Sequence, residues 1–122
     1  MRIWLIFSCV IGFLSVAGGA FGAHALEATI TPERLDTFDT GTQYAQMHAV
    51  ALLGVSILGA RRSSRLLTVT AASFTLGALL FTGSLWTLAV TGVTWLGAVT
   101  PLGGLAFLTG WTSLLIYGWR SR

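Results

Sequence analysis

The chain has 122 residues, of which 54% are hydrophobic and only 9% are charged. Soluble domains carry about a quarter charged residues, because their helices need one polar face toward water. The uncharged runs 3–26, 40–60 and 66–119 leave nothing from which to build such faces. The composition therefore excludes an ordinary soluble domain and indicates a protein that lies mostly in hydrocarbon.

The formal net charge of +3 does not indicate a nucleic-acid-binding protein. Nucleic-acid binding needs cations gathered on one face. Here six of the seven arginines flank the apolar runs, as arginines do beside membrane spans. These six are Arg2, Arg61, Arg62, Arg65, Arg120 and Arg122.

The first apolar run, residues 3–23, is long enough to cross a bilayer. A cleaved signal peptide is the alternative, since Arg2 provides a short basic start and residues 23–25 resemble a cleavage site. The run is longer than the apolar part of a usual signal peptide, and the later spans need a partner helix. We therefore expect a retained span over about 3–24.

A polar connection follows over residues 25–39. Thr31 and Pro32 read as the N-cap and first residue of a helix. We expect a short helix from Pro32 to about Phe38 at the membrane surface, with a re-entrant segment as the alternative.

The second predicted span, 40–60, has an unusually polar first third for a membrane helix. Polar side chains are costly against lipid, so they should face other helices or headgroups. Tyr44 and His48 are four residues apart and therefore share one helix face.

The basic turn 61–65 leads to a third span at 66–91, and a short uncharged turn leads to a fourth at 101–119, which Pro101 can open. The resulting fold class is all-α: one integral membrane domain, 1–122, with four transmembrane helices in an antiparallel bundle. Six arginines then lie on one side, so the positive-inside rule predicts that both termini are cytoplasmic.

Small residues recur on one face of three of these spans, and such faces let membrane helices approach closely. They are Gly12, Ser15, Gly19 and Gly22 in the first span, Ser73, Gly77, Ser84, Thr87 and Thr91 in the third, and Gly103, Ala106, Gly110, Ser113 and Tyr117 in the fourth.

Three stretches resemble the bacterial membrane family known as domain of unknown function 423, whose animal relatives are called transmembrane protein 256-like. They are GAFGAHAL at 19–26, TGTQYAQMHAVALL at 40–53 and the segment 81–111. The resemblance covers nearly the whole chain and implies a small four-helix protein of the bacterial inner membrane. It implies no catalytic residue or substrate. Thr82 and Trp86 depart from the serine and tyrosine usual in the family, so no role can depend on a phenol at position 86.

Both histidines have two interpretations. His48 either joins helices through a hydrogen bond to Ser84 or Thr87, or it is a ligand or proton site, as ionisable groups within membranes often are. His24 either caps the end of the first helix or pairs with Glu27, three residues later. The ligand hypothesis predicts one outward-facing site lined by His24, Glu27, Gln43, Tyr44, His48 and Ser84.

The sequence contains no motif for a catalytic or metal centre. Zinc-binding spacings, the nucleophile elbow G-x-S-x-G and the phosphate-binding loop are all missing. The two histidines are expected at different depths, which disfavours haem. We therefore predict no catalytic residues, no metal and no cofactor.

Two functions remain open beside that of an enzyme or redox subunit, for which only His24 with Glu27 offers two converging titratable groups. The first is a non-enzymatic structural, assembly or regulatory component, with the bilayer, further copies of itself or other membrane proteins as partners. The second is a small transport or lipid- or ligand-binding protein that uses the outward site around His24, Tyr44 and His48.

Overall fold

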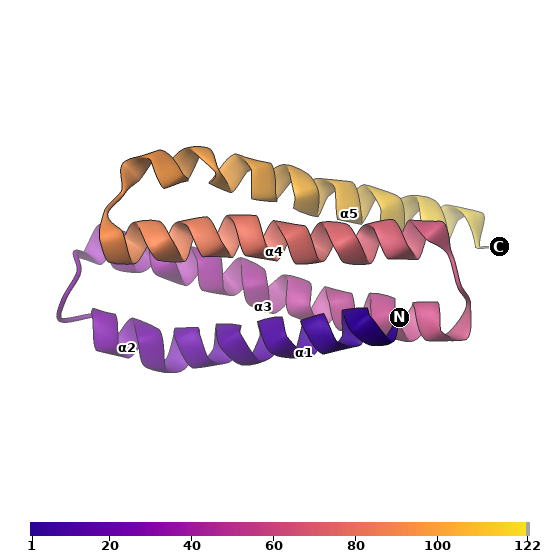
Figure 1. Cartoon of the computed structure of the whole chain (residues 1–122), viewed down its shortest axis with the longest axis horizontal. Helices are drawn as coiled ribbons and strands as arrows, with labels where there is room; N and C mark the ends of the chain where they lie inside the picture. The colour runs from indigo at the N-terminus through magenta and orange to yellow at the C-terminus, as the bar shows by residue number, and fades with distance from the viewer. Residues whose placement is uncertain (122) are drawn as a thin grey trace.

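The computed structural model describes residues 1–121, and all regular elements in this part are helices. The long helices run alternately in opposite directions (Figure 1). In chain order the elements are α1 (Arg2–Ala17), the π-helix η1 (Gly18–Gly22), α2 (Ala23–Leu26), α3 (Pro32–Arg61), α4 (Arg65–Thr91), the 3-10 helix η2 (Thr94–Ala98) and α5 (Thr100–Arg120). The predicted all-α, antiparallel fold is confirmed.

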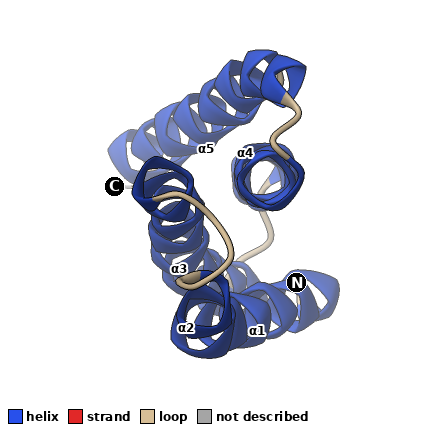
Figure 2. Cartoon of the chain, turned by 90° about the vertical axis from the view of Figure 1, so that its left-hand side faces the viewer, coloured by secondary structure: helices blue, strands red, loops and turns tan. Residues whose placement is uncertain are grey.

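The helices pack mainly in the order α1, α3, α4, α5, and each contacts the next. Viewed end-on, α1 and α5 lie on opposite sides of the central α3–α4 pair (Figure 2). The N-terminus, the α3–α4 turn and the C-terminal end of α5 lie at one end of the molecule (Figure 1). One hollow lies between α1 and α4, and a groove lies between α3 and α5.

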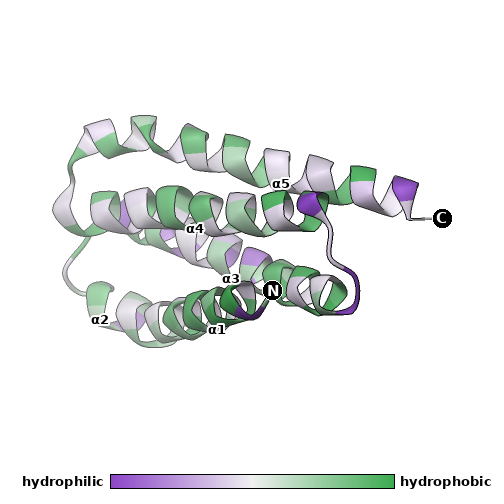
Figure 3. Ribbon diagram, turned by 45° about the vertical axis from the view of Figure 1, so that its right-hand side comes forward, coloured by the Kyte–Doolittle hydropathy of each residue, from purple (hydrophilic) through white to green (hydrophobic). Residues whose placement is uncertain are grey.

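Three helical segments are long and apolar enough to cross a membrane: Arg2–Leu26, Arg65–Thr91 and Thr94–Arg120. Much of their apolar surface faces outward, as membrane helices require, with Phe13 73% and Leu108 64% exposed. Hydrophobic residues cover these helices, whereas hydrophilic ones gather near the chain ends and the α3–α4 turn (Figure 3). Helix α3 is not among the three, because its first half carries the polar residues.

Helix α3 begins as predicted but continues further. The Thr31 hydroxyl accepts the Arg34 backbone N–H at 3.3 Å, which is an N-cap, and Pro32 is the first helical residue. The expected short helix ending near Phe38 is wrong, since the helix runs without a break to Arg61. Gly41 does not end it, because α4 packs closely there.

Aromatic rings seated against glycines hold α4 to α5. Phe107 lies against Gly77, and Phe74 lies against Gly110. A Cβ atom on Gly103 would lie 2.5 Å from the Phe81 backbone nitrogen, so these backbones approach as closely as only glycine permits. The predicted small faces are confirmed here, but Thr87 and Thr91 are exposed and bond back to their own helix.

Candidate functional site

Among residues 1–121, His48 is the most buried ionisable residue, with 3% of its surface exposed. Its Nδ1 lies 2.7 Å from the Tyr44 carbonyl oxygen one turn earlier. Because a carbonyl only accepts, Nδ1 carries the proton, and Nε2 is left as an acceptor. The Trp111 indole N–H of α5 donates to Nε2 at 3.0 Å. Both ring nitrogens are thus bonded within the protein.

This arrangement corrects the expected partners of His48. Ser84 bonds to Thr100 instead, with 2.7 Å between their hydroxyl oxygens. Thr87 donates to the Gly83 carbonyl of its own helix. The true partner, Trp111, lies 63 residues away in the chain. No local spacing could reveal it, because the pairing depends on how α5 folds back.

Aromatic rings surround His48 on three sides. Phe107 stacks on the imidazole with 3.6 Å between ring centroids and 11° between planes. Phe74 meets it edge-on at 5.2 Å. Trp111 also meets it edge-on at 5.9 Å, and the Tyr44 ring lies tilted against that of Phe81 with 4.4 Å between centroids. The imidazole therefore packs among aromatic rings that join α3, α4 and α5.

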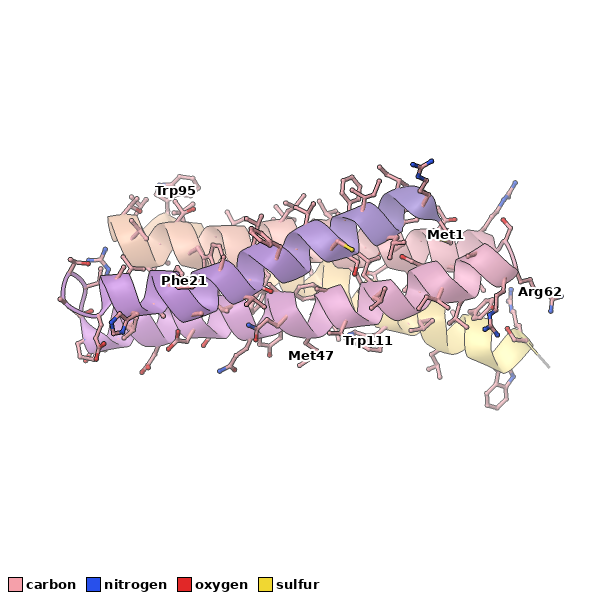
Figure 4. All side chains as sticks on the ribbon, turned by 90° about the horizontal axis from the view of Figure 1, so that it is seen from below. Met1, Phe21, Met47, Arg62, Trp95 and Trp111 are labelled. Atoms are coloured by element: carbon pink, nitrogen blue, oxygen red, sulfur yellow. The ribbon has the colours of Figure 1, made fainter. Side chains whose placement is uncertain are left out.

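The outer surface of this stack forms a groove between α3 and α5. Its volume is about 650 Å³, and its lining is almost entirely apolar. Tyr44, Met47 and Trp111 are 39%, 56% and 43% exposed along it. Met47 and Trp111 lie near each other on the face seen in Figure 4. Within residues 1–121 the Tyr44 hydroxyl has no hydrogen-bond partner, so it is a free polar group beside an apolar groove.

A second aromatic cluster lies on the opposite side of α3. Trp86 of α4 stacks on Phe38 with 4.9 Å between centroids and 9° between planes. Its indole N–H donates to the Thr42 hydroxyl at 3.0 Å. Thr42 in turn donates to the Phe38 carbonyl. A hollow of about 190 Å³ beside Trp86 separates α1 from α4.

The glycines of the π-helix make this second cluster possible. A Cβ atom on Gly18 would overlap the Trp86 ring, and one on Gly22 would crowd Phe38. π-Helical turns shift the register of a helix and are frequent at functional sites. The run of glycines was visible in the sequence as a small face, but its partner Trp86 was missed.

Arg34 is another residue that sequence reasoning overlooked. Its Nε donates to the Ala89 carbonyl at 2.8 Å, and its Nη2 donates to the Val90 carbonyl at 2.9 Å. Both carbonyls belong to the last turn of α4, whose C-cap Gly92 has a φ of +72°. Charge-assisted bonds of this kind satisfy carbonyls that a helix end leaves free. The arginine thus ties the start of α3 to the end of α4.

The structure does not gather the predicted outward site in one place. His24 and Glu27 lie exposed near the end of α2, with 3.9 Å between Nδ1 and Oε2. Tyr44 and His48 belong to the groove, Ser84 to the α4–α5 contact, and Gln43 is exposed on α3. Within the described residues no three His, Cys, Asp or Glu side chains are placed to hold a metal ion.

Comparisons with known proteins support the membrane assignment. The family described as "Protein of unknown function (DUF423)" matches residues 18–104. The chain is 41% identical to the "UPF0382 membrane protein YwdK" of Bacillus subtilis, over 95% of each chain. It is 39% identical to the "UPF0382 inner membrane protein YgdD" of Escherichia coli K12, over 94% of this chain and 88% of that one. No solved structure matches this chain.

The family match spans more than half of the chain, and it includes the π-helix glycines, α3 and Trp86. The relatives are similar over nearly their whole lengths. Together with the apolar helices, these similarities make the protein a multi-pass protein of the bacterial inner membrane. The chain belongs to the family of membrane proteins described as DUF423.

Proposed function

We propose that all four long helices cross the membrane and that both termini lie in the cytoplasm. Helix α3 has 30 residues and is therefore about 45 Å long, enough to span a bilayer. It packs between α1 and α4, which are both long and apolar enough to cross. Its polar residues Thr42, His48 and Ser56 are buried against other helices or bonded within α3, so they meet little lipid. The arginine-rich end supports the cytoplasmic placement.

We infer that the protein is a non-enzymatic structural, assembly or regulatory component of the membrane. The observation that supports this most directly is that both ring nitrogens of His48 are hydrogen-bonded, one to the Tyr44 carbonyl and the other to the Trp111 indole. An imidazole bonded at both nitrogens must break a hydrogen bond before it can take part in proton transfer. Other buried hydroxyls also serve packing: Ser8 donates to the Ala49 carbonyl, and Thr82 donates to the Gly41 carbonyl.

A second candidate function rests on the groove between α3 and α5. Its exposed rings, Tyr44 and Trp111, offer flat faces to a molecule that arrives from the membrane. The free Tyr44 hydroxyl can donate one hydrogen bond to an oxygen of that molecule. The expected ligand is a membrane-soluble compound with a flat ring and a carbonyl or similar oxygen. Pockets of this size with few polar groups commonly hold small ligands.

Native mass spectrometry of the protein released from mild detergent separates the two candidates. Tyr44→Phe removes only the free hydroxyl, and Thr75→Val is the control, because it removes a hydroxyl that lines neither the groove nor any other hollow. A discrete adduct on the wild type that is lost in Tyr44→Phe but kept in the control supports ligand binding. A bare protein at a defined oligomeric mass, unchanged in both variants, supports the structural role and contradicts the groove ligand.

A further inference from the structure

Positive charge is concentrated at the end of the molecule where α3 turns into α4. The described arginines at this end are Arg2, Arg61, Arg62, Arg65 and Arg120. All four carboxylates lie in residues 27–39, near the opposite end (Figure 1). Within residues 1–121 the only ion pair joins His24 to Glu27, so none of these arginines pairs with a side-chain carboxylate in this part of the chain.

Two of these arginines face a common hollow. It has a volume of about 240 Å³ and lies between the α3–α4 connection and the last turn of α5. Arg62 lines it from the connection, and Arg120 lines it from α5. Ser63, Ser64 and Tyr117 complete most of the wall. Unlike the groove between α3 and α5, this hollow is lined mainly by polar groups.

The connection that carries Arg62 is fixed at both ends. The Arg62 backbone N–H donates to the Leu58 carbonyl at 3.1 Å, which closes the last turn of α3. The Ser64 hydroxyl accepts the Leu66 backbone N–H at 3.2 Å and so caps α4. The backbone is extended at both caps, Arg62 and Ser64. The wall of the hollow is therefore held in place by the chain itself.

The polar side chains that line the hollow can all donate hydrogen bonds, and its hydroxyls can also accept them. Neither the Ser63 nor the Tyr117 hydroxyl donates to any acceptor within residues 1–121, and the two guanidinium groups carry only donors. Convergent donors with two positive charges and no carboxylate match an oxyanion. Arginine is especially suited to phosphate, because its planar fork can bond two oxygens at once.

We propose that the hollow lined by Arg62 and Arg120 binds the phosphate of an anionic phospholipid headgroup. The hollow lies at the end of the membrane helices, where headgroups are the nearest phosphates. Basic pockets between membrane helices bind headgroups in this way. The proposal depends only on this end lying at a membrane surface, and not on what the α3–α5 groove holds. Its failure would leave the functions proposed above untouched.

The experiment is native mass spectrometry of the whole protein with added phosphatidylglycerol or phosphatidylcholine of identical acyl chains. The test variant is the double substitution R62Q and R120Q. The control is R2Q and R65Q, which removes the same charge from the same end but from residues outside the hollow. Helix content by circular dichroism and the thermal midpoint confirm that both variants fold.

The wild type should bind phosphatidylglycerol in preference to phosphatidylcholine. At about 1 kcal/mol for each arginine, the test variant should lose roughly thirtyfold in affinity for the anionic lipid. The control should keep most of the preference. Equal losses in both variants would show that diffuse charge, rather than the hollow, attracts the lipid, and would overturn the proposal. Complete displacement of the lipid by excess inorganic phosphate would make it a site for free phosphate instead.

Discussion

Two tryptophans make the same kind of bond to α3 but lie in opposite surroundings. Trp86 of α4 donates its indole N–H to Thr42, and Trp111 of α5 donates its indole N–H to His48. The Trp86 ring lies between helices, against Gly18 and Gly41. The Trp111 ring is 43% exposed at the edge of the α3–α5 groove.

The difference comes from what faces each ring. At Trp86 the glycines of η1 and α3 let their backbones approach the indole closely, so the half-buried ring packs between helices. At Trp111 the bulky Phe107 and His48 fill the space between α3 and α5, so the rings hold the helices apart and leave a groove. Glycines of η1 and α3 therefore seat the Trp86 ring between helices, whereas Phe107 and His48 leave Trp111 at the edge of a groove that is accessible from the membrane.

The difference between the two tryptophans is tested most directly by removing each ring. Trp86→Ala should lower the free energy of unfolding by about 3 kcal/mol, because it removes a large ring packed between helices. Trp111→Ala should cost about 2 kcal/mol, since lipid can fill much of the space that it leaves but the buried His48 Nε2 loses its donor. Unfolding by sodium dodecyl sulfate in mixed micelles measures both. A larger loss for Trp111 would show that the groove, not the glycine cluster, is the main packing centre.

The buried His48 and the exposed His24 should contribute differently to stability. His48→Ala should cost about 2 kcal/mol, because it orphans the Trp111 N–H and removes a stacked ring. His24→Ala should change stability by less than about 0.5 kcal/mol, since the His24 side chain is 88% exposed. The same unfolding assay compares them. Equal effects would indicate that both histidines belong to one structural unit.

A substitution of Arg34 tests whether the contact between α3 and α4 also depends on the bonds from this arginine to the last turn of α4. Arg34→Gln should cost about 1.5 kcal/mol, because it removes charge-assisted bonds to the Ala89 and Val90 carbonyls. Hydrogen exchange should rise in the last turn of α4 and in η2. Arg61→Gln, which removes the same charge at the other end, is the control. Unchanged exchange near Ala89 would show that the arginine does not hold this turn.

The smallest expected effect comes from the acceptor of the Trp86 bond. Thr42→Val keeps the shape of the side chain but removes the hydroxyl, so it should cost about 1 kcal/mol. Thr40→Val is the control, because the exposed Thr40 hydroxyl bonds only to the Asp36 carbonyl of its own helix. Thermal unfolding in detergent is sensitive enough to compare them. An equal effect of both substitutions would mean that the Trp86 bond adds nothing to packing.

Several features of the fold were predictable from local chemistry. Composition indicated a membrane protein, and the small residues marked the faces along which the helices meet. Thr31 and Pro32 marked the start of α3, because a cap and a proline act within one helical turn. The predicted end of the surface helix was wrong, since no residue between Phe38 and Gly41 ends the helix.

The candidate site was predictable only in part. Tyr44 and His48 share a helix face, as their spacing requires, and His24 and Glu27 lie close together for the same reason. The bonds from Trp111 to His48 and from Arg34 to α4 span 63 and about 55 residues, so no periodicity encodes them. They arise only when the helices pack.

The sequence alone determined that the protein lies in a membrane, that it is helical and on which faces its helices pack against one another. These follow from hydropathy and from side-chain size, which act residue by residue. The tertiary structure decided which tryptophan packs against glycines, which histidine is buried and which two arginines share a hollow. Each of these depends on contacts between helices that are distant in the chain, where one ring or one missing Cβ atom sets how closely two backbones can lie.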